Sequence, residues 1–264
     1  MKDRIKTGVI GIIAIGCIIW LGEYAVLAAL TAIGAVATYE YATVVYTKEK
    51  KAQCLLLALM NTFIILSGYF YPSYTTAILI SSTVLLFIVD IITANYEADY
   101  TVYGIWGLVY VGFFLSLATK MLAWENGLFI VVMTVMLCMA SDIGAYFAGM
   151  YFGKHKLCPA ISPKKTVEGS IGGVLLASVV AVVFAYLAKN IGYNKYWFVF
   201  IIIGAATAVL SQFGDLAASM VKRKFGAKDY GNILPGHGGF MDRLDSILFG
   251  IAAVFCTFIV FGVV

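Results

Sequence analysis

The sequence carries very little charge. Only 12% of its 264 residues are Asp, Glu, Lys or Arg, whereas 62% are hydrophobic and the mean hydropathy is +0.95. A soluble globular domain has about 25% charged residues, and its core cannot absorb this much apolar surface. The composition therefore excludes an ordinary soluble protein and indicates an integral membrane protein.

Paired cysteines are also lacking. The five cysteines have no CxxC spacing, and most of them lie within apolar runs: Cys17, Cys54, Cys138, Cys158 and Cys256. This distribution predicts neither disulfides nor a cysteine metal site, and we interpret these residues as small apolar side chains.

The alternating pattern of a membrane β-barrel is absent, and long apolar runs such as Thr75–Val89 favour helices. A helix needs about 20 mostly apolar residues to cross the hydrocarbon, and about nine stretches meet this requirement. They lie near residues 8–22, 24–45, 53–70, 75–94, 101–121, 127–150, 168–188, 196–217 and 245–264. No soluble domain or internal repeat is recognisable. The sequence therefore predicts an all-α fold, a single polytopic membrane domain (1–264) forming a bundle of about nine transmembrane helices.

Basic residues gather on one side of the predicted membrane. Counting the spans alternately places Lys2, Lys50, the loop 154–165 and the segment 222–243 on the same side, whereas the opposite loops hold few cations. The positive-inside rule assigns this side and the N-terminus to the cytoplasm, so we expect a multi-pass protein of the cytoplasmic membrane. The net charge of +4 reflects this sidedness and implies no nucleic-acid partner.

Carboxylates within the apolar runs point to function, because a charge in hydrocarbon is costly. On the predicted topology all of them lie in the cytoplasmic half of the membrane or at its edge: Glu40, Asp90, Asp142, Asp215, Asp242 and Asp245. Their convergence on one face of the membrane predicts a polar site there.

Helical spacing groups some of these carboxylates with cations. One helix face would carry a carboxylate, a hydroxyl and two cations at i, i+4, i+7 and i+8: Asp215, Ser219, Lys222 and Arg223. Asp242 and Asp245 share a face if the last helix begins before them. Simple ion pairing, such as Asp242 with Arg243, is an alternative for any single pair. It does not explain the glycine-rich loop Pro235–Gly239 beside them.

Clustered carboxylates and cations suit a metal–polyphosphate substrate. Mg²⁺ is typically held by one or two carboxylates plus substrate phosphates, and Lys and Arg bind phosphate oxygens. Gly236, Gly238 and Gly239 would let backbone N–H groups approach an anion closely. A second basic segment, Gly153–Gly173, places its lysines just before a helix N-terminus, which is a ready anion site. Membrane topology alone also favours cations in this loop.

The run SMVKRKFGAKDYGNILPGHGGFMDRLDS, from Ser219 to Ser246, resembles the signature of the phosphatidate cytidylyltransferases, also called CDP-diacylglycerol synthases. Every fixed position of that signature matches: Ser219, Lys222, Arg223, Lys228, Asp229, Gly231, Pro235, His237, Gly238, Gly239, Asp242, Arg243 and Asp245. The segments SDIGAYFAG, FGKHKLCPAISPKKT and SQFGDLAAS are similar to that family as well. The likeness covers roughly 141–246, where the catalytic motifs are concentrated. The N-terminal half is similar only as a series of membrane spans.

The resemblance implies a nucleotidyltransferase of phospholipid biosynthesis, with CTP and phosphatidic acid as substrates, CDP-diacylglycerol and pyrophosphate as products, and Mg²⁺ as cofactor. We expect Asp215 and Asp242 to hold the metal, with Asp142 and Asp245 as supporting ligands. Lys222 and Arg223 are expected to be catalytic together with Asp215 and Asp242. The expected substrate-binding residues are Ser219, Lys164, Lys165, Lys228, Gly236, His237, Gly238, Gly239 and Arg243. For His237, phosphate contact, proton transfer and a purely structural role all stay open.

Two other functions are compatible with parts of this pattern. An ion-coupled transporter also has intramembrane aspartates, but it would place them at the bilayer midplane and often in repeated halves. A CTP-dependent transferase acting on another lipid phosphate would need the same residues, because nothing in the sequence specifies the acceptor. Assembly into a homodimer is left open.

Overall fold

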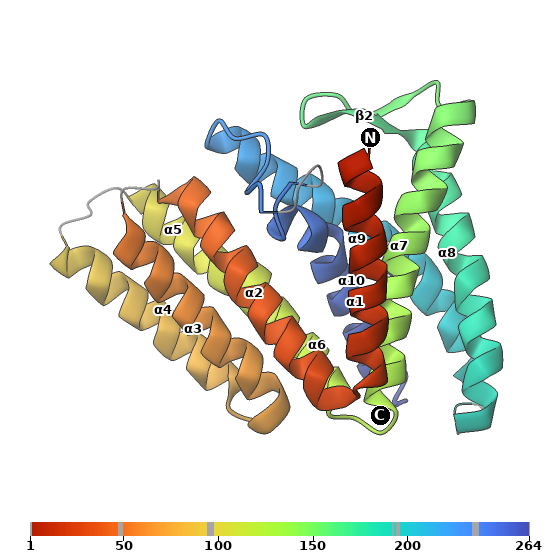
Figure 1. The fold of residues 1–264 in the computed structure, drawn as a ribbon, viewed down its shortest axis with the longest axis horizontal. Coiled ribbons are helices and arrows are strands. Elements are labelled where there is room, and N and C mark those ends of the chain that lie inside the picture. Colours follow the sequence, from red (N-terminus) through yellow and green to blue (C-terminus); the bar gives the residue numbers. More distant parts are fainter. Residues whose placement is uncertain are drawn as a thin grey trace. The chain divides into compact units, whose positions relative to one another are not determined.

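A computed structural model of the chain describes residues 2–46, 50–93, 98–191, 193, 196–233 and 238–263, apart from the side chains of 2–8, 12, 98 and 190. Helices dominate it (Figure 1). In chain order the elements are α1 (Lys2–Trp20), α2 (Glu23–Val45), α3 (Lys51–Phe70), α4 (Thr75–Ile92), α5 (Ala98–Gly107), the π-helix η1 (Leu108–Phe113), α6 (Phe114–Leu122), α7 (Gly127–Phe152), β1 (Lys156–Cys158), β2 (Ser162–Thr166), α8 (Val167–Ala188), the 3₁₀-helix η2 (Lys189–Ile191), α9 (Trp197–Lys224) and α10 (Met241–Val260).

The predicted all-α membrane fold is confirmed. In the described chain, eight helices are long and apolar enough to cross a bilayer, with α5, η1 and α6 joined into one span, Asp99–Leu122. A shorter apolar helix, Val9–Trp20, accounts for the first predicted span. The predicted bounds are wrong at three helices, since α1 begins at Lys2, α9 continues to Lys224, and α10 runs from Met241 to Val260. A helix need not end where its apolar run ends, because the headgroup region also accommodates polar helical turns.

Two compact units can be distinguished by their internal contacts. Unit 1 comprises Met1–Ala123 and Phe225–Leu244, and unit 2 comprises Trp124–Lys224 and Asp245–Val264. The signature segment, Ser219–Ser246, therefore contributes residues to both units. The single polytopic domain stays a prediction.

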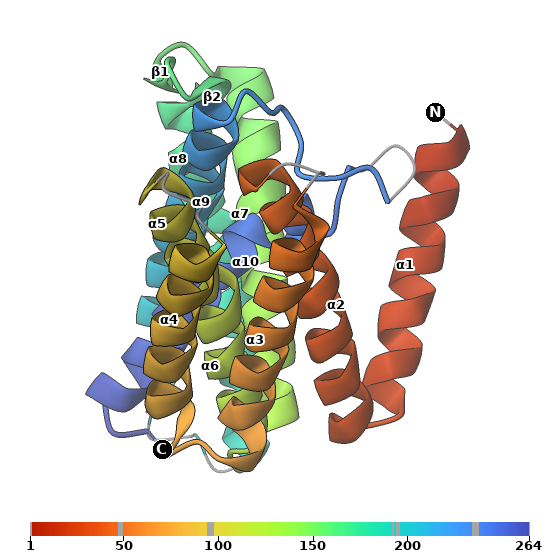
Figure 2. The ribbon, with the colours of Figure 1, turned by 90° about the vertical axis from the view of Figure 1, so that its left-hand side faces the viewer.

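In unit 1, α2, α3 and α4 run side by side (Figure 2). A buried amide joins them to the span that contains η1: Asn61 on α3 donates to Thr38 Oγ1 at 3.0 Å and to the carbonyl of Gly107 at 3.1 Å. Interhelical hydrogen bonds of this kind and the packing of small residues hold membrane helices together, because lipid tails are as apolar as the helices themselves. A Cβ at Gly112 would overlap the Asn61 amide, so the glycine makes room for this contact.

Small residues also hold unit 2 together. The pair α7 and α8 packs closely (Figure 1), and Ala140, Ala177 and Ala208 of α7, α8 and α9 form a buried cluster. At Gly144 of α7, a Cβ would lie 2.6 Å from the carbonyl oxygen of Gly172 on α8. The two backbones can approach this closely only because side chains are missing at the crossing.

The segment between α7 and α8 contains a short antiparallel hairpin, in which Lys156 of β1 lies opposite Thr166 of β2. Thr166 is also the N-cap of α8, where its Oγ1 accepts the N–H of Gly169 at 3.1 Å. Glu168, in the first turn of α8, accepts the backbone N–H groups of Lys154 and His155. These contacts fix the hairpin to the start of α8. The basic segment therefore lies just before a helix N-terminus, as predicted.

The outer face of α8 is apolar and exposed, at Ile171, Leu175, Val179, Val183 and Tyr186. Such a face is typical of a helix that contacts lipid. Together with the eight long apolar helices, it describes a multi-pass membrane protein.

Candidate active site

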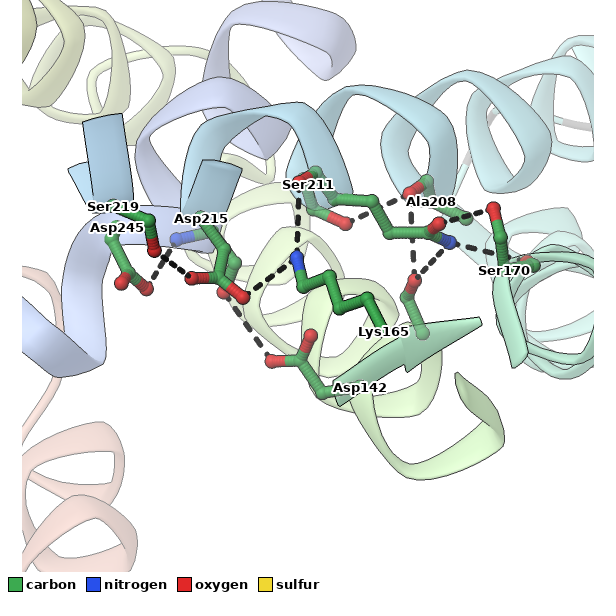
Figure 3. A network of polar contacts seen from close by, with 11 residues as sticks. Asp142, Lys165, Ser170, Ala208, Ser211, Asp215, Ser219 and Asp245 are labelled. Atoms are coloured by element: carbon green, nitrogen blue, oxygen red, sulfur yellow. Dashed lines mark hydrogen bonds and ion pairs between the residues drawn. The ribbon is translucent and has the colours of Figure 1, made fainter. Parts of the chain in front are cut away.

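The predicted carboxylate Asp215 lies in a polar network of unit 2 (Figure 3). Its Oδ2 pairs with Lys165 Nζ at 2.7 Å, and its Oδ1 accepts the hydroxyl of Ser219 at 3.4 Å. Lys165 comes from strand β2 of the hairpin, and Asp215 and Ser219 are one turn apart on α9. The structure therefore brings together three of the predicted site residues from two separate motifs.

Gln212 supports this network, although it was not among the site residues predicted from the sequence. Its main-chain carbonyl accepts Lys165 Nζ at 3.2 Å. Its side-chain Nε2 donates to the carbonyl of Ser170 at 3.2 Å and to Ser141 Oγ at 3.4 Å, while its Oε1 accepts the Ser170 hydroxyl. Gln212 thus ties α9 to α7 and α8 and at the same time holds the lysine. The feature of the sequence that could have indicated Gln212 is an amide side chain within the apolar run that forms α9.

Two further predicted carboxylates meet at another serine of unit 2. Ser246 Oγ donates to Asp142 Oδ2 at 3.3 Å, and the Ser246 N–H donates to Asp245 Oδ1 at 2.8 Å. Asp142 comes from α7 and Asp245 from α10, and both are drawn with Asp215 in Figure 3. Unit 2 therefore collects carboxylates from three helices in one polar region of an apolar bundle.

The predicted cations differ in burial. Lys222, near the end of α9, is only 7% exposed, which is unusual for a lysine. Lys165 is partly buried, and the other predicted cations are exposed: Lys164, Arg223, Lys228 and Arg243. Since α9 continues to Lys224, the predicted helical placement of Asp215, Ser219, Lys222 and Arg223 is confirmed.

Asp242 lies in unit 1, where its Oδ2 accepts the N–H of Tyr230 at 2.9 Å and the N–H of Gly239 at 3.2 Å. Gly238 adopts a φ of 82°, in the left-handed region that favours glycine, and this turn brings the Gly239 N–H back toward the carboxylate. Asp242 and Asp245 are both on α10, as their shared helical face requires.

Glu40 of α2 also reaches the signature segment within unit 1. Its Oε2 accepts the N–H of Met241 at 2.9 Å. The sequence indicated Glu40 as an intramembrane carboxylate but gave it no role, because it lies outside the resemblance. The predicted binding residues Gly236 and His237, with Pro235, lie outside the described residues.

The donor chemistry of Asp142, Asp215 and Asp245 fits Mg²⁺, which prefers hard carboxylate oxygens. Across the described ranges, no group of three or more His, Cys, Asp or Glu side chains is placed to hold a metal ion. In nucleotide enzymes, Mg²⁺ is usually held by one or two carboxylates together with substrate phosphates.

An apolar helical bundle with carboxylates, hydroxyls and a lysine gathered into one polar network defines a multi-pass membrane protein with an enzyme-like site. Comparison with known proteins identifies the family. Residues 2–261 match the cytidylyltransferase family. The chain belongs to this family, and by class it is a nucleotidyltransferase.

Several relatives carry the name phosphatidate cytidylyltransferase. The protein of Bacillus subtilis (strain 168) is 33% identical over 258 residues, which cover 94% of this chain and 94% of that protein. The protein of Haemophilus influenzae is 45% identical over 124 residues, 46% of this chain and 43% of the relative. The protein of Staphylococcus haemolyticus is 39% identical over 139 residues, 53% and 51% of the two chains. In these last two cases the match spans about half of the relative's length.

Proposed function

We propose that this protein transfers the cytidylyl group of CTP to phosphatidic acid and releases pyrophosphate, using Mg²⁺ at the cytoplasmic face of the cell membrane. The names of the relatives support these substrates. The observation that carries the proposal is the polar network of unit 2. There Lys165 of strand β2 lies 2.7 Å from Asp215 of the otherwise apolar helix α9, and the hydroxyl of Ser219 donates to the same carboxylate.

The proposed reaction balances without a covalent enzyme intermediate. A phosphate oxygen of phosphatidic acid attacks the α-phosphorus of CTP and forms the new P–O bond. The bond from the α-phosphorus to the oxygen that bridges to the β-phosphorus breaks, and pyrophosphate leaves with that electron pair. Because the lipid phosphate is already an anion, the enzyme has to supply mainly position and charge neutralisation.

Lysines of unit 2 are suited to that task. Lys165 is held between Asp215 Oδ2 and the carbonyl of Gln212, so its ammonium group is oriented before any phosphate arrives. Lys222 is buried near the end of α9, the helix that carries Asp215 and Gln212. A charge-assisted contact to phosphate is stronger there than in water. Arg223 is exposed and can contact the phosphates from the aqueous side.

One or two of the carboxylates Asp142, Asp215 and Asp245 would hold Mg²⁺ together with the nucleotide phosphates, and when bound the ion would neutralise negative charge on those phosphates. The hydrogen bond from Ser246 to Asp142 and the bond from Ser219 to Asp215 orient two of these carboxylates. Asp242 as a further ligand stays a prediction from the resemblance.

The basic loops support the cytoplasmic orientation. On that side the site would be open to CTP, a cytosolic nucleotide, and to phosphatidic acid of the inner leaflet. The hairpin 156–166 carries Lys164 and Lys165 at that end of α8. Carboxylates and lysines at the end of a membrane bundle can meet a lipid phosphate at headgroup depth.

The test is a transfer assay with purified protein, CTP labelled at the α-phosphate, and either phosphatidic acid, a polyprenyl phosphate or no acceptor. We expect label to enter lipid only with phosphatidic acid, with one pyrophosphate released per transfer and an absolute need for a divalent cation. Transfer to the polyprenyl phosphate alone would identify a different acceptor. Ion-driven uptake into proteoliposomes without any transfer would indicate a transporter and contradict the proposal.

A further inference from the structure

Glu40 is a buried acidic residue in a half of the chain that carries no part of the signature. It lies on the apolar helix α2 and is only 3% exposed. A carboxylate is costly in such surroundings unless it satisfies hydrogen-bond donors. Its known partner is the N–H of Met241, 201 positions further along the chain, at 2.9 Å.

Met241 is the first residue of α10. The first N–H groups of a helix have no partner within the helix, and the helix dipole favours negative charge at this end. Glu40 therefore serves as a cap for α10 that is supplied by another helix. The residue next to Met241 is Asp242, so this contact lies beside a predicted functional carboxylate.

Glycines of the signature segment make room for Glu40. A Cβ at Gly239 would lie 2.5 Å from Glu40 Oε2, and a Cβ at Gly231 would overlap the same carboxylate group. Real Cβ atoms do not approach other atoms this closely. Both positions are therefore small because the Glu40 side chain occupies the space beside them.

A second set of contacts holds the same segment against α2. The ring of Tyr41, next to Glu40, lies 5.8 Å from the ring of Tyr230, which is only 3% exposed. The Tyr230 N–H in turn donates to Asp242 Oδ2 at 2.9 Å. Helix α2 thus contacts the segment from Tyr230 to Met241 near both of its ends.

We propose that Glu40 is a positioning residue for the cytidylyl transfer. It holds the backbone of Gly239–Met241 and so orients the carboxylate of Asp242 at the start of α10. Its part in catalysis rests on the proposed function, whereas its effect on this backbone does not.

Three substitutions separate hydrogen-bond acceptance from charge. Glu40→Gln keeps the length and an acceptor oxygen, Glu40→Asp keeps the charge but is one methylene too short, and Glu40→Ala removes both. A positioning role predicts that Gln retains most of the kcat, whereas Asp and Ala lose about 10- to 100-fold, because a buried N–H is left unpaired. The same three changes at Glu23, which is exposed at the other end of α2, are the matched control and should leave kcat unchanged.

Backbone hydrogen–deuterium exchange of residues 239–244, measured on the purified variants without substrate, provides a readout that does not depend on activity. We expect faster exchange in Glu40→Ala and Glu40→Asp and wild-type exchange in Glu40→Gln. If Glu40→Ala does not fold, the comparison of Glu40→Gln with Glu40→Asp still tests whether hydrogen-bond acceptance or charge is needed. Higher activity in Asp than in Gln, or unchanged exchange in both Asp and Ala, would overturn the proposal. A wild-type protein that fails to transfer cytidylyl would refute the proposed function and leave the exchange result standing.

The glycines offer an independent check on the same contact. Gly231→Ala should lower the melting temperature of the wild-type protein but cause little further loss in a Glu40→Ala background, where the space is vacated. Fully additive losses would contradict the packing of Gly231 against Glu40.

Discussion

Lys164 and Lys165 are neighbours in the sequence, yet the structure gives them different surroundings. Successive side chains of a strand point to opposite faces, and both residues lie on β2. Lys165 therefore reaches Asp215 and the carbonyl of Gln212, whereas Lys164 is exposed. Of the two, Lys165 is placed to act in the polar network.

Removing the charge of Lys222 should impair CTP use without preventing assembly. Lys222→Met keeps the apolar stem, and losing a charge-assisted contact to phosphate costs about 1.5–3 kcal/mol, or roughly 10- to 150-fold in activity. Transfer rates at varied CTP would measure the loss. Lys51→Met, at an exposed position on α3, is the control and should behave as wild type. Normal turnover and normal apparent affinity for CTP in Lys222→Met would remove this residue from the site.

Asp215→Asn and Asp242→Asn test the predicted metal ligands. Each keeps size but removes the charge that a hard cation needs, so each should nearly abolish transfer. The double variant should be little worse than either single one, because residues that act as a unit are strongly non-additive. Activity across a titration of Mg²⁺ and Mn²⁺ is the measurement, and partial rescue by high metal would support ligation.

The alternative for Asp242 is simple neutralisation of its neighbour Arg243. In that case Asp242→Asn combined with Arg243→Gln would restore activity, with no change in metal dependence. Such a recovery would show that the Asp242 charge serves structure rather than metal binding.

At the level of elements, the close packing of α7 and α8 supports the polar network. Ser141 of α7 and Ser170 of α8 both contact Gln212 of α9. These contacts require the two helices to approach closely, which depends on the glycines at their crossing. A side chain in place of one of these glycines would move the hydroxyls of Ser141 and Ser170 away from the Gln212 amide.

Gly144→Ala should therefore destabilise unit 2. Its Cβ would lie 2.6 Å from the carbonyl oxygen of Gly172 and 2.9 Å from Leu176 Cβ. Overpacking of this kind costs about 1–3 kcal/mol, which thermal unfolding in detergent would detect as a lower melting temperature. Gly16→Ala is the matched control, because a Cβ there meets nothing within 4 Å. Equal melting temperatures for both variants would show that the crossing tolerates a methyl group.

For the molecule as a whole, the orientation in the membrane decides which solution the site faces. Glu125 and Lys156 flank α7, whose 26 residues span about 39 Å at 1.5 Å per residue, more than the thickness of the hydrocarbon. The two positions must therefore lie on opposite sides of the bilayer if α7 crosses it.

Cysteine labelling tests this orientation in a background that lacks the native cysteines. Lys156→Cys should react with an impermeant thiol reagent only after the inner face is made accessible, and Glu125→Cys should react in intact cells. Both positions are exposed. Labelling of Lys156→Cys from outside would show that the orientation is the opposite of the predicted one, and it would contradict a cytosolic site for CTP.

The sequence by itself determined the class of fold, the positions of the membrane helices and the identity of many polar residues in the network. These follow from local quantities: the length of an apolar run and the cost of a charge within it. The long signature segment likewise indicated the family before any residue had been placed in space.

Only the tertiary structure decided which of those residues meet. The contact of Glu40 with Met241, the choice of Lys165 over Lys164, and the central place of Gln212 all join segments far apart in the chain. Such contacts depend on how closely two backbones can approach and on which face a side chain occupies. Both are set by packing among many residues at once, and no local pattern in the sequence contains that information.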